Sequence, residues 1–354
     1  MSMFARLVLV VTLALAGPAF ADDDAAQPPT SERLTQLVNA LSASPHFKVR
    51  ATAAVALGRL ADPLAASSLS DALRSDEHYA VRVAAASALG RLPTSAGVPS
   101  LLVALHDPEP FVRDEAQGAL DRFHTVADVA AFRDALQSED PVARLAAVRA
   151  FGEVLRTTST VAALVVEALG DDSDEVARVA ENALAGIPHD RAVPVLIGAL
   201  TSGGSQVRAT CARLLSRRAD KGAVEPLIAL MTSTDEGEEV RRTARDALRA
   251  HKEYLDVPSR ILAARDAAPA MRDARIVSLR VLAALSEPGA SDVIVNQLID
   301  DAIKDTDAIV RIGGARAASD LGGDRAKRLL AAARAAEPDE RTRRQLDLLL
   351  KSTR

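Results

Sequence analysis

Aromatic residues are scarce in this chain, which has no tryptophan, two tyrosines and seven phenylalanines among its 354 residues. Large compact enzymes usually bury more aromatic mass than this. Nearly half of the residues, 48%, are nevertheless hydrophobic, so alanine, leucine and valine must build most of the core. Side chains of this size suit closely packed helices, and we therefore expect thin helical layers stacked one on the next.

The chain also lacks several sequence motifs that would indicate a particular cofactor or reaction. Its single cysteine, Cys211, excludes an intramolecular disulfide, and it has no C-x-x-C-H haem site, P-loop or G-x-S-x-G motif. The formal net charge of -5 is small for this length and leaves no basic excess. A dedicated nucleic-acid binder usually carries one. We expect no cofactor and no nucleic-acid partner.

The first 21 residues have the pattern of a secretory signal peptide. Arg6 supplies a positive start, Leu7 to Ala16 form a ten-residue apolar run, and Ala19-Phe20-Ala21 offers small residues for cleavage. The run is shorter than the about 20 apolar residues of a membrane-spanning helix. We therefore expect cleavage after Ala21, a flexible polar tether over residues 22–30 and a soluble protein exported to the periplasm or secreted, with no membrane span left.

One pattern, V-R-x-x-A-x-x-A-L, recurs through the rest of the chain and is clearest at residues 49–60 and 81–92. Apolar or small residues at positions -1, +3, +6, +7 and +10 from its arginine lie on one face of a helix. A second apolar helical segment precedes each copy, so the repeat is one helical hairpin. The arginine slot, 31 to 36 residues apart in successive copies, falls at Arg50, Arg82, Arg113, Arg144, Ala177, Arg208, Arg241, Arg275 and Arg311.

A hairpin with one apolar face cannot bury that face alone, so neighbouring hairpins must stack. Nine units span Ser31 to Leu321, and a tenth, capping hairpin spans about residues 324–351. The last predicted helix, "DERTRRQLDLLLK", begins with polar residues, as the exposed end of a stack should. We expect one repeat domain over residues 31–354.

The short V-R-x-x-A-x-x-A-L-G-x-L unit resembles the HEAT-like repeats of phycobilisome lyases, over about nine-tenths of the chain. The resemblance implies an all-α fold, a right-handed α-α superhelix of about ten helical hairpins. It says little about function, because the same repeat serves scaffolds, adaptors and a few enzymes. Tetratricopeptide and ankyrin repeats have similar periods, but their signature residues are not present.

Aspartates stand six residues before the slot at Asp76, Asp107, Asp171, Asp235 and Asp305, although the slot after Asp171 holds Ala177. A carboxylate in the turn and a guanidinium in the next helix can pair within one repeat or between two repeats. Such pairs would resemble the Asp–Arg ladder of HEAT proteins. A residue repeated in every unit more often holds the stack together than binds a ligand. We assign a structural ladder to Asp76, Asp107, Asp235 and Asp305 and to Arg50, Arg82, Arg113, Arg144, Arg208, Arg241 and Arg311.

Another set of arginines holds the +5 slot, on the side of the second helices opposite the buried face. The set consists of Arg149, Arg213, Arg280 and Arg316, with Arg242 and Arg249 beside the interrupting Asp246. We expect them to form a stripe on the concave face that binds an acidic protein or peptide, although arginines also occur on faces that only contact water. The first two units offer a rival, smooth site around Ala51, Val83 and Gly90.

The six histidines do not form a metal motif. No two of them lie at i, i+4, and none is followed by glutamate as in deoxyhypusine hydroxylase, an enzyme of similar architecture; His106-Asp107 and His189-Asp190 are the nearest matches. The sequence thus favours a non-catalytic scaffold or adaptor, with no metal site. An enzyme or enzyme subunit, lyase-like or hydroxylase-like, and a structural spacer in the cell envelope remain as alternatives.

Overall fold

The structure, a computed structural model, describes residues 30–266, 268–286 and 293–353. In this part of the chain every regular element is a helix, either α-helical or 3-10. The predicted all-α class is therefore confirmed. The expected signal peptide, residues 1–21, and nearly all of the expected tether lie outside the described residues. No helix in the described range is long and apolar enough to cross a membrane.

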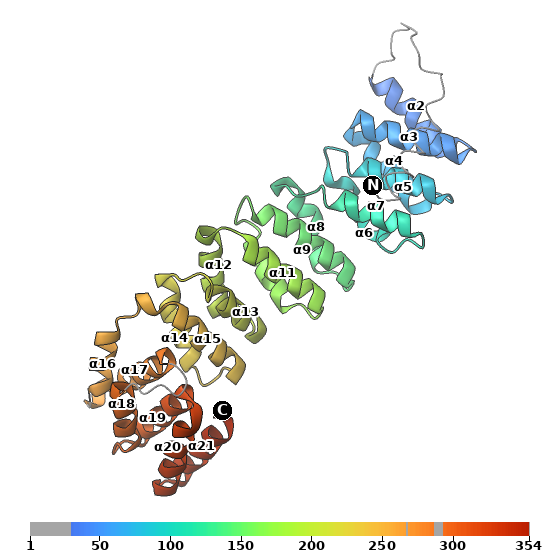
Figure 1. The fold of residues 1–354 in the computed structure, drawn as a ribbon. Helices are drawn as coiled ribbons and strands as arrows, with labels where there is room; N and C mark the ends of the chain where they lie inside the picture. Colours follow the sequence, from blue (N-terminus) through green and yellow to red (C-terminus); the bar gives the residue numbers. More distant parts are fainter. Residues whose placement is uncertain (1–29, 267, 287–292, 354) are drawn as a thin grey trace. The chain divides into compact units, whose positions relative to one another are not determined.

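The α-helices alternate as the first and second helices of successive hairpins (Figure 1). We call the first helix of each hairpin an A helix and the second a B helix. The A helices are α2 (Thr30–Ala43), α4 (Ala66–Ser75), α6 (Val98–Ala104), α8 (Val129–Leu136), α10 (Ala162–Glu167), α12 (His189–Ser202), α14 (Val224–Thr232), α16 (Val257–Arg265), α18 (Val293–Ile303) and α20 (Gly323–Ala336). The B helices are α3 (Phe47–Leu60), α5 (Tyr79–Leu89), α7 (Pro110–Leu120), α9 (Pro141–Leu155), α11 (Asp174–Gly186), α13 (Ser205–Leu215), α15 (Glu238–Ala250), α17 (Arg272–Leu285), α19 (Ala308–Leu321) and α21 (Glu340–Ser352).

The chain divides into two compact units, unit 1 up to Ala119 and unit 2 from Leu120 onward. Within unit 1, α3 packs against α5, and α4 packs against both α2 and α6. Within unit 2, every A helix packs against its own B helix, and B helices from neighbouring hairpins pack in pairs such as α9 with α11 and α17 with α19. Each unit is therefore a stack of hairpins.

Small residues set the close spacing of the B helices. The +3 slot is fully buried as Ala85, Ala147, Ala180, Cys211 or Ala244, so Cys211 fills an alanine position. In α19 the slot is Gly314, where a Cβ atom would lie 2.9 Å from the backbone nitrogen of Ile303. A Cβ atom on the adjacent Gly313 would lie 2.6 Å from Cγ1 of Ile276 in α17. These two glycines let α19 approach both α18 and α17 closely.

Candidate functional site

A ladder of arginine–carboxylate pairs runs along the turns that lead into the B helices. In Arg82–Asp107, Nε and Nη2 each bond one carboxylate oxygen at 2.8 Å. The Nη1 group of Arg82 donates to the carbonyl of Asp76, six residues earlier, at 2.9 Å. The carboxylate partner therefore belongs to the next repeat, while the residue six positions earlier gives its backbone carbonyl. The same two-sided arrangement joins Arg50 to Asp76, Arg144 to Asp171 and Arg311 to Glu337.

The ladder carboxylates are shielded from water and held in their charged form. Burial alone would raise the pKa of the Asp76 carboxyl, but hydrogen bonds from the Arg50 guanidinium and the His78 N–H outweigh it, and the pKa lies below its ordinary value. Hydrogen bonds from an arginine and a backbone N–H likewise lower the pKa of Asp107, Asp171 and Asp305 against burial. For Glu337, the hydrogen bond from Arg311 is the largest cause of a lowered pKa. These pairs link consecutive turns.

Two of the predicted ladder positions differ from the pattern. Asp235 is exposed, and Glu236 takes its place by pairing with Arg208 through Nη2 and Oε1 at 2.6 Å. The assignment of Asp235 to the ladder is therefore wrong: the carboxylate facing Arg208 stands one residue later in this turn, five before Arg241. Arg241 itself pairs inside its own helix with Glu238, at 2.8 Å.

The remaining ladder arginines keep part of the arrangement. Arg113 donates from Nη1 to the carbonyl of Asp107 at 2.7 Å. Arg275, which also holds the slot, donates from Nη1 to the Asp305 carboxylate at 2.7 Å and from Nε to the Ala264 carbonyl at 3.2 Å. Arg113 therefore contacts the turn before its own helix α7, whereas Arg275 of α17 contacts the end of α16 and the turn before α19.

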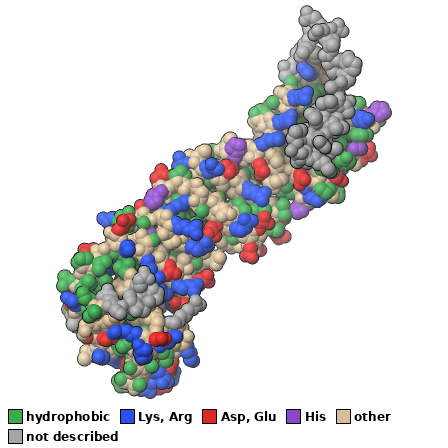
Figure 2. Space-filling model, viewed as in Figure 1, with side chains coloured by type: hydrophobic (Ala, Val, Ile, Leu, Met, Phe, Trp, Pro, Cys, Tyr) green, Lys and Arg blue, Asp and Glu red, His purple; other side chains and the backbone are tan. Residues whose placement is uncertain are grey.

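The arginines expected to form one basic stripe have different surroundings. Arg149 and Arg242 are exposed and, among the described residues, make no ion pair. Arg213 is held by both oxygens of Glu181. Arg249 bonds Asp246 at 2.6 Å and the carbonyl of Ala284 at 2.8 Å. In Figure 2, Lys and Arg side chains lie among Asp and Glu side chains on the visible face of unit 2, which fits this pairing.

Arg280 does not belong to an exposed stripe. Its side chain is 6% exposed, and Nε bonds Asp320 of α19 at 2.7 Å while Nη2 bonds the carbonyl of Met231 at 2.8 Å. The expectation that Arg280 faces a partner is therefore wrong. Helix α17 packs against α14, α15 and α19, and a buried guanidinium needs hydrogen-bond partners there to offset its desolvation.

Arg149 lies at an open hollow of about 600 Å³ between α9 and α11. Gly152 and Gly186 line it as residues without side chains, and Asn182, the +5 residue of α11, lies across from Arg149. A Cβ atom on Gly152 would lie 3.0 Å from the Cβ of Ala183, so the glycine keeps the two helices close. The hollow is thus formed by small residues and edged by polar side chains of both charges, with Arg149 and Arg156 beside Asp121 and Glu153.

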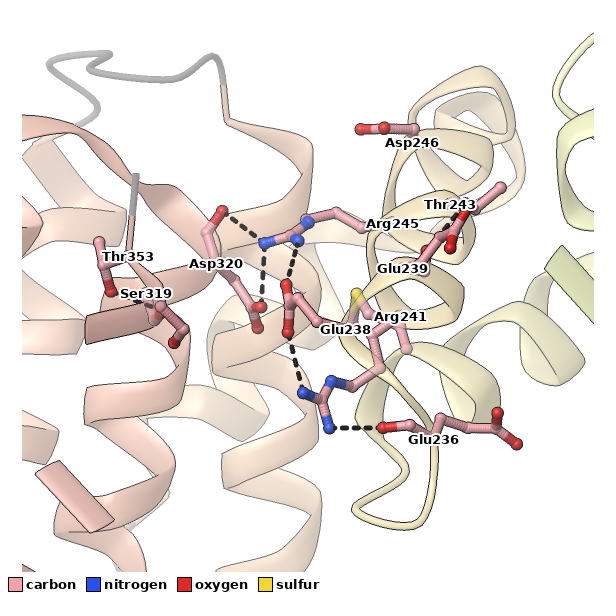
Figure 3. A network of polar contacts seen from close by, with 12 residues as sticks. Glu236, Glu238, Glu239, Arg241, Thr243, Arg245, Asp246, Ser319, Asp320 and Thr353 are labelled. Carbon is pink, nitrogen blue, oxygen red and sulfur yellow. Dashed lines mark hydrogen bonds and ion pairs between the residues drawn. The ribbon is translucent and has the colours of Figure 1, made fainter. Parts of the chain in front are cut away.

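A polar network joins α15 to α19 across two repeats (Figure 3). Arg245 Nη1 bonds both the carboxylate and the carbonyl of Asp320, at 3.0 and 3.1 Å. Arg245 also bonds Glu238, which bonds Arg241 in turn. No sequence pattern predicts this contact, because Arg245 and Asp320 are 75 residues apart and neither holds a recurring slot.

Unit 1 carries a row of aromatic rings at the starts of its B helices. Phe47 stacks on His78 with ring centroids 3.6 Å apart and an interplanar angle of 4°. His78 contacts Tyr79 at 5.2 Å, and Tyr79 contacts Phe111 at 6.5 Å. Tyr79 and Phe111 are exposed. Part of this row could be predicted from the sequence, because Phe47 and Tyr79 both stand three residues before a slot arginine and so recur at the same place in two repeats. The predicted smooth site lies beside it, with Ala51 and Val83 half-buried and Gly90 buried.

Groups that could carry out chemistry are few in the described residues. No three His, Cys, Asp or Glu side chains in that part of the chain gather closely enough to hold a metal ion. Burial raises the pKa of the Cys211 thiol to about 12, far from a reactive thiolate. His251 is fully buried, with Nδ1 2.8 Å from the carbonyl of Ala247.

Comparison with known proteins identifies the repeats. A family model described as HEAT repeats matches residues 34–121, 67–152, 98–185 and 161–249, which together cover more than half of the chain. No curated protein matches the chain in sequence.

Solved structures with similar folds include an engineered protein, 21% identical over 90% of this chain and 98% of its own, with a TM-score of 0.29. Human deoxyhypusine hydroxylase is 23% identical over 71% of this chain and 96% of its own, with a TM-score of 0.29. The complex of CpcE and CpcF of phycocyanin lyase from Nostoc sp. is 18% identical over 77% of this chain and 100% of that chain, with a TM-score of 0.30.

Proposed function

This chain belongs to the HEAT-repeat family, and we propose that it is a non-catalytic scaffold or adaptor that binds a protein or peptide along the B helices of unit 2. The observation that carries the proposal is the hollow between α9 and α11. Gly152 and Gly186 among its lining residues leave room for the backbone of a partner, and Arg149 and Asn182 can donate hydrogen bonds to that partner.

The partner is an acidic one. Arg149 and Arg242 are exposed without an ion pair among the described residues, and a guanidinium offers carboxylates a planar pair of donors. Arg213 and Arg249 contribute less, because Glu181 and Asp246 already neutralise them. The binding surface therefore centres on Arg149 and Arg242 rather than on a continuous row.

The site of action is outside the cytoplasm, in the periplasm or in the medium. This part of the proposal rests on the sequence of residues 1–21, whose charged start, apolar run and small residues at the cleavage point fit a secretory signal. The single cysteine permits no intramolecular disulfide, so burial and ion pairs such as those of the ladder must stabilise the exported fold.

A photoreactive amino acid at position 182 tests the binding surface directly. In cells that make the protein, irradiation should join it through this position to a partner of one defined mass. The matched control is the same amino acid at position 167, an exposed position on the A helix α10. Adducts of equal yield at both positions, or none at 182, would remove the hollow as a binding site.

The aromatic row of unit 1 supports a second candidate surface. Tyr79 and Phe111 are exposed, and Val83 lies one turn along α5 from Tyr79, on the same face. Exposed aromatic rings near small residues suit an apolar segment of a partner. The two surfaces differ in their dependence on salt, because ion pairs are screened and apolar contacts are not.

A further inference from the structure

The polar network between α15, α17 and α19 contains more positive than negative charge. Its two carboxylates are Glu238 and Asp320, and each is shared by two guanidiniums. Arg245 and Arg280 bond Asp320 at 3.0 and 2.7 Å. Arg241 and Arg245 bond Glu238 at 2.8 and 3.4 Å. Both oxygens of each carboxylate are therefore occupied.

Arg316 is the fourth guanidinium of this group. It stands on α19, one turn before Asp320, and its side chain is half-buried. In the part of the chain that the structure describes, it makes no hydrogen bond or ion pair. Burial lowers its pKa, and the positive charges of Arg280 and Arg241 lower it further, against an opposing effect of Asp320.

The neighbouring charges do not correct the excess. Glu236 is paired with Arg208, and Asp246 is paired with Arg249. Four arginines thus share two carboxylates, of which the Asp320 side chain is 11% exposed and the Glu238 side chain is 57% exposed. A cation in such a place is stabilised when an anion with matching geometry joins it.

Access to this group is limited to two of the four arginines. The side chains of Arg245 and Arg280 are 10% and 6% exposed, whereas that of Arg241 is 28% exposed and that of Arg316 is half-buried. An anion from solvent therefore reaches Arg316 and Arg241 first. Arg280 and Arg245 are less accessible and are already bonded to Asp320.

We propose that Arg316 and Arg241 form a binding site for a carboxylate side chain of an acidic peptide segment. This assignment rests on the proposed function, and it names the chemistry by which the partner is held at this end of unit 2. A carboxylate has two oxygens in one plane, which match the planar guanidinium as Asp320 matches Arg280 in the same group.

A short peptide of three glutamates, with both ends blocked, tests the site by titration calorimetry on the purified chain at low ionic strength. It is too short to span from α19 to the hollow at α9, because three extended residues cover about 10 Å. We expect the peptide to bind, a matching peptide of three glutamines not to bind, and the affinity to fall as salt is added. Arg316→Gln should weaken binding about tenfold or more, since it removes a charge-assisted pair.

Arg133→Gln is the matched control, an exposed arginine on the A helix α8 outside both proposed binding surfaces, and it should leave the affinity within about twofold of the wild type. Arg316→Lys keeps the charge and loses the planar pair of donors, so it should bind with intermediate affinity and also serves if the glutamine variant does not fold. Unchanged binding by both Arg316 variants overturns the assignment, as does binding of inorganic phosphate without binding of the peptide. Failure here with a position-182 adduct intact removes this site alone and leaves the proposed scaffold function standing.

Discussion

Arg144 joins two repeats through one guanidinium, with Nε and Nη2 on Asp171 at 2.8 and 2.9 Å and Nη1 on the carbonyl of Ser138 at 2.9 Å. Three donors of one side chain thus bond acceptors in two successive turns, the carbonyl of Ser138 and the carboxylate of Asp171. The side chain of Asp171 is 8% exposed, so it depends on these donors and on the N–H of Ser173. The stack is therefore held by polar contacts at its turns as well as by apolar contacts between helices.

Arg144→Ala should lower the free energy of unfolding by about 1–3 kcal/mol, because it leaves a buried carboxylate without its main partner. Asp171 keeps the Ser173 hydrogen bond, so the larger cost of a fully isolated buried charge does not apply. Urea unfolding followed by circular dichroism measures the change. Arg133→Ala, at an exposed position on α8, is the control and should change stability by less than about 0.5 kcal/mol. Equal effects of the two variants would contradict the structural role of the ladder.

Acid should destabilise the chain through the same carboxylates. Their pKa values are lowered in the folded state, so the unfolded state binds more protons around and below its ordinary Asp pKa of about 3.9. This stabilisation is complete above that pKa and is lost as the pH falls through the lower folded-state value. Urea unfolding at pH 7, 5 and 3 should show little change from these groups between pH 7 and 5 and a clear loss by pH 3.

Asp107→Asn provides the comparison for the acid experiment. It lacks one of the ladder carboxylates, so it should start less stable at pH 7 and lose less between pH 5 and 3 than the wild type does. An identical loss in both proteins would mean that the acid sensitivity arises elsewhere.

Gly314→Ala should destabilise unit 2 by about 1–3 kcal/mol, the usual range for overpacking. The new Cβ would meet the backbone nitrogen of Ile303 at 2.9 Å, and backbone cannot move aside as a side chain can. Gly198→Ala in α12 is the matched control, since its Cβ would meet nothing within 4 Å. That variant should gain about 0.5–1 kcal/mol from lower backbone entropy. Thermal unfolding separates the two, and a loss of similar size in both would count against the close approach of α19 and α18.

The protein recovered from cells should begin at Asp22, because cleavage follows Ala21 in the proposed signal peptide. Terminal sequencing or intact mass measurement of the extracellular or periplasmic fraction gives the answer. Retention of Met1, or recovery of the protein in the cytoplasm only, would end the proposal of export.

The hairpins could be predicted from the sequence because each unit repeats the same local pattern. The arginine slot, the small +3 residue and the apolar face all depend on contacts within one repeat or with the next, which are the same in every copy. Helix ends are less predictable, because a proline does not always mark a helix start: α12 begins at His189 and contains Pro194 in its interior.

The surroundings of the +5 arginines could not be predicted, because they depend on how closely particular helices approach. Periodicity placed Arg280 on the same line as Arg149, yet Arg280 is buried against Asp320 and Arg149 is exposed. The difference follows from the tight packing that Gly313 and Gly314 allow around α19. One-residue differences between turns had a similar effect, and placed Glu236 rather than Asp235 against Arg208.

The most direct test of the account is the effect of charge reversal on the position-182 adduct. A chain with Arg149→Glu and Arg242→Glu should lose most of the adduct, and added salt should weaken adduct formation by the wild type, because the partner is held by ion pairs. Neither substituted residue is buried, so the variant should melt as the wild type does. Val83→Glu, in the rival surface of unit 1, should leave the yield unchanged. An adduct that survives the charge reversal and salt but disappears in Val83→Glu would contradict the account and assign the partner to unit 1.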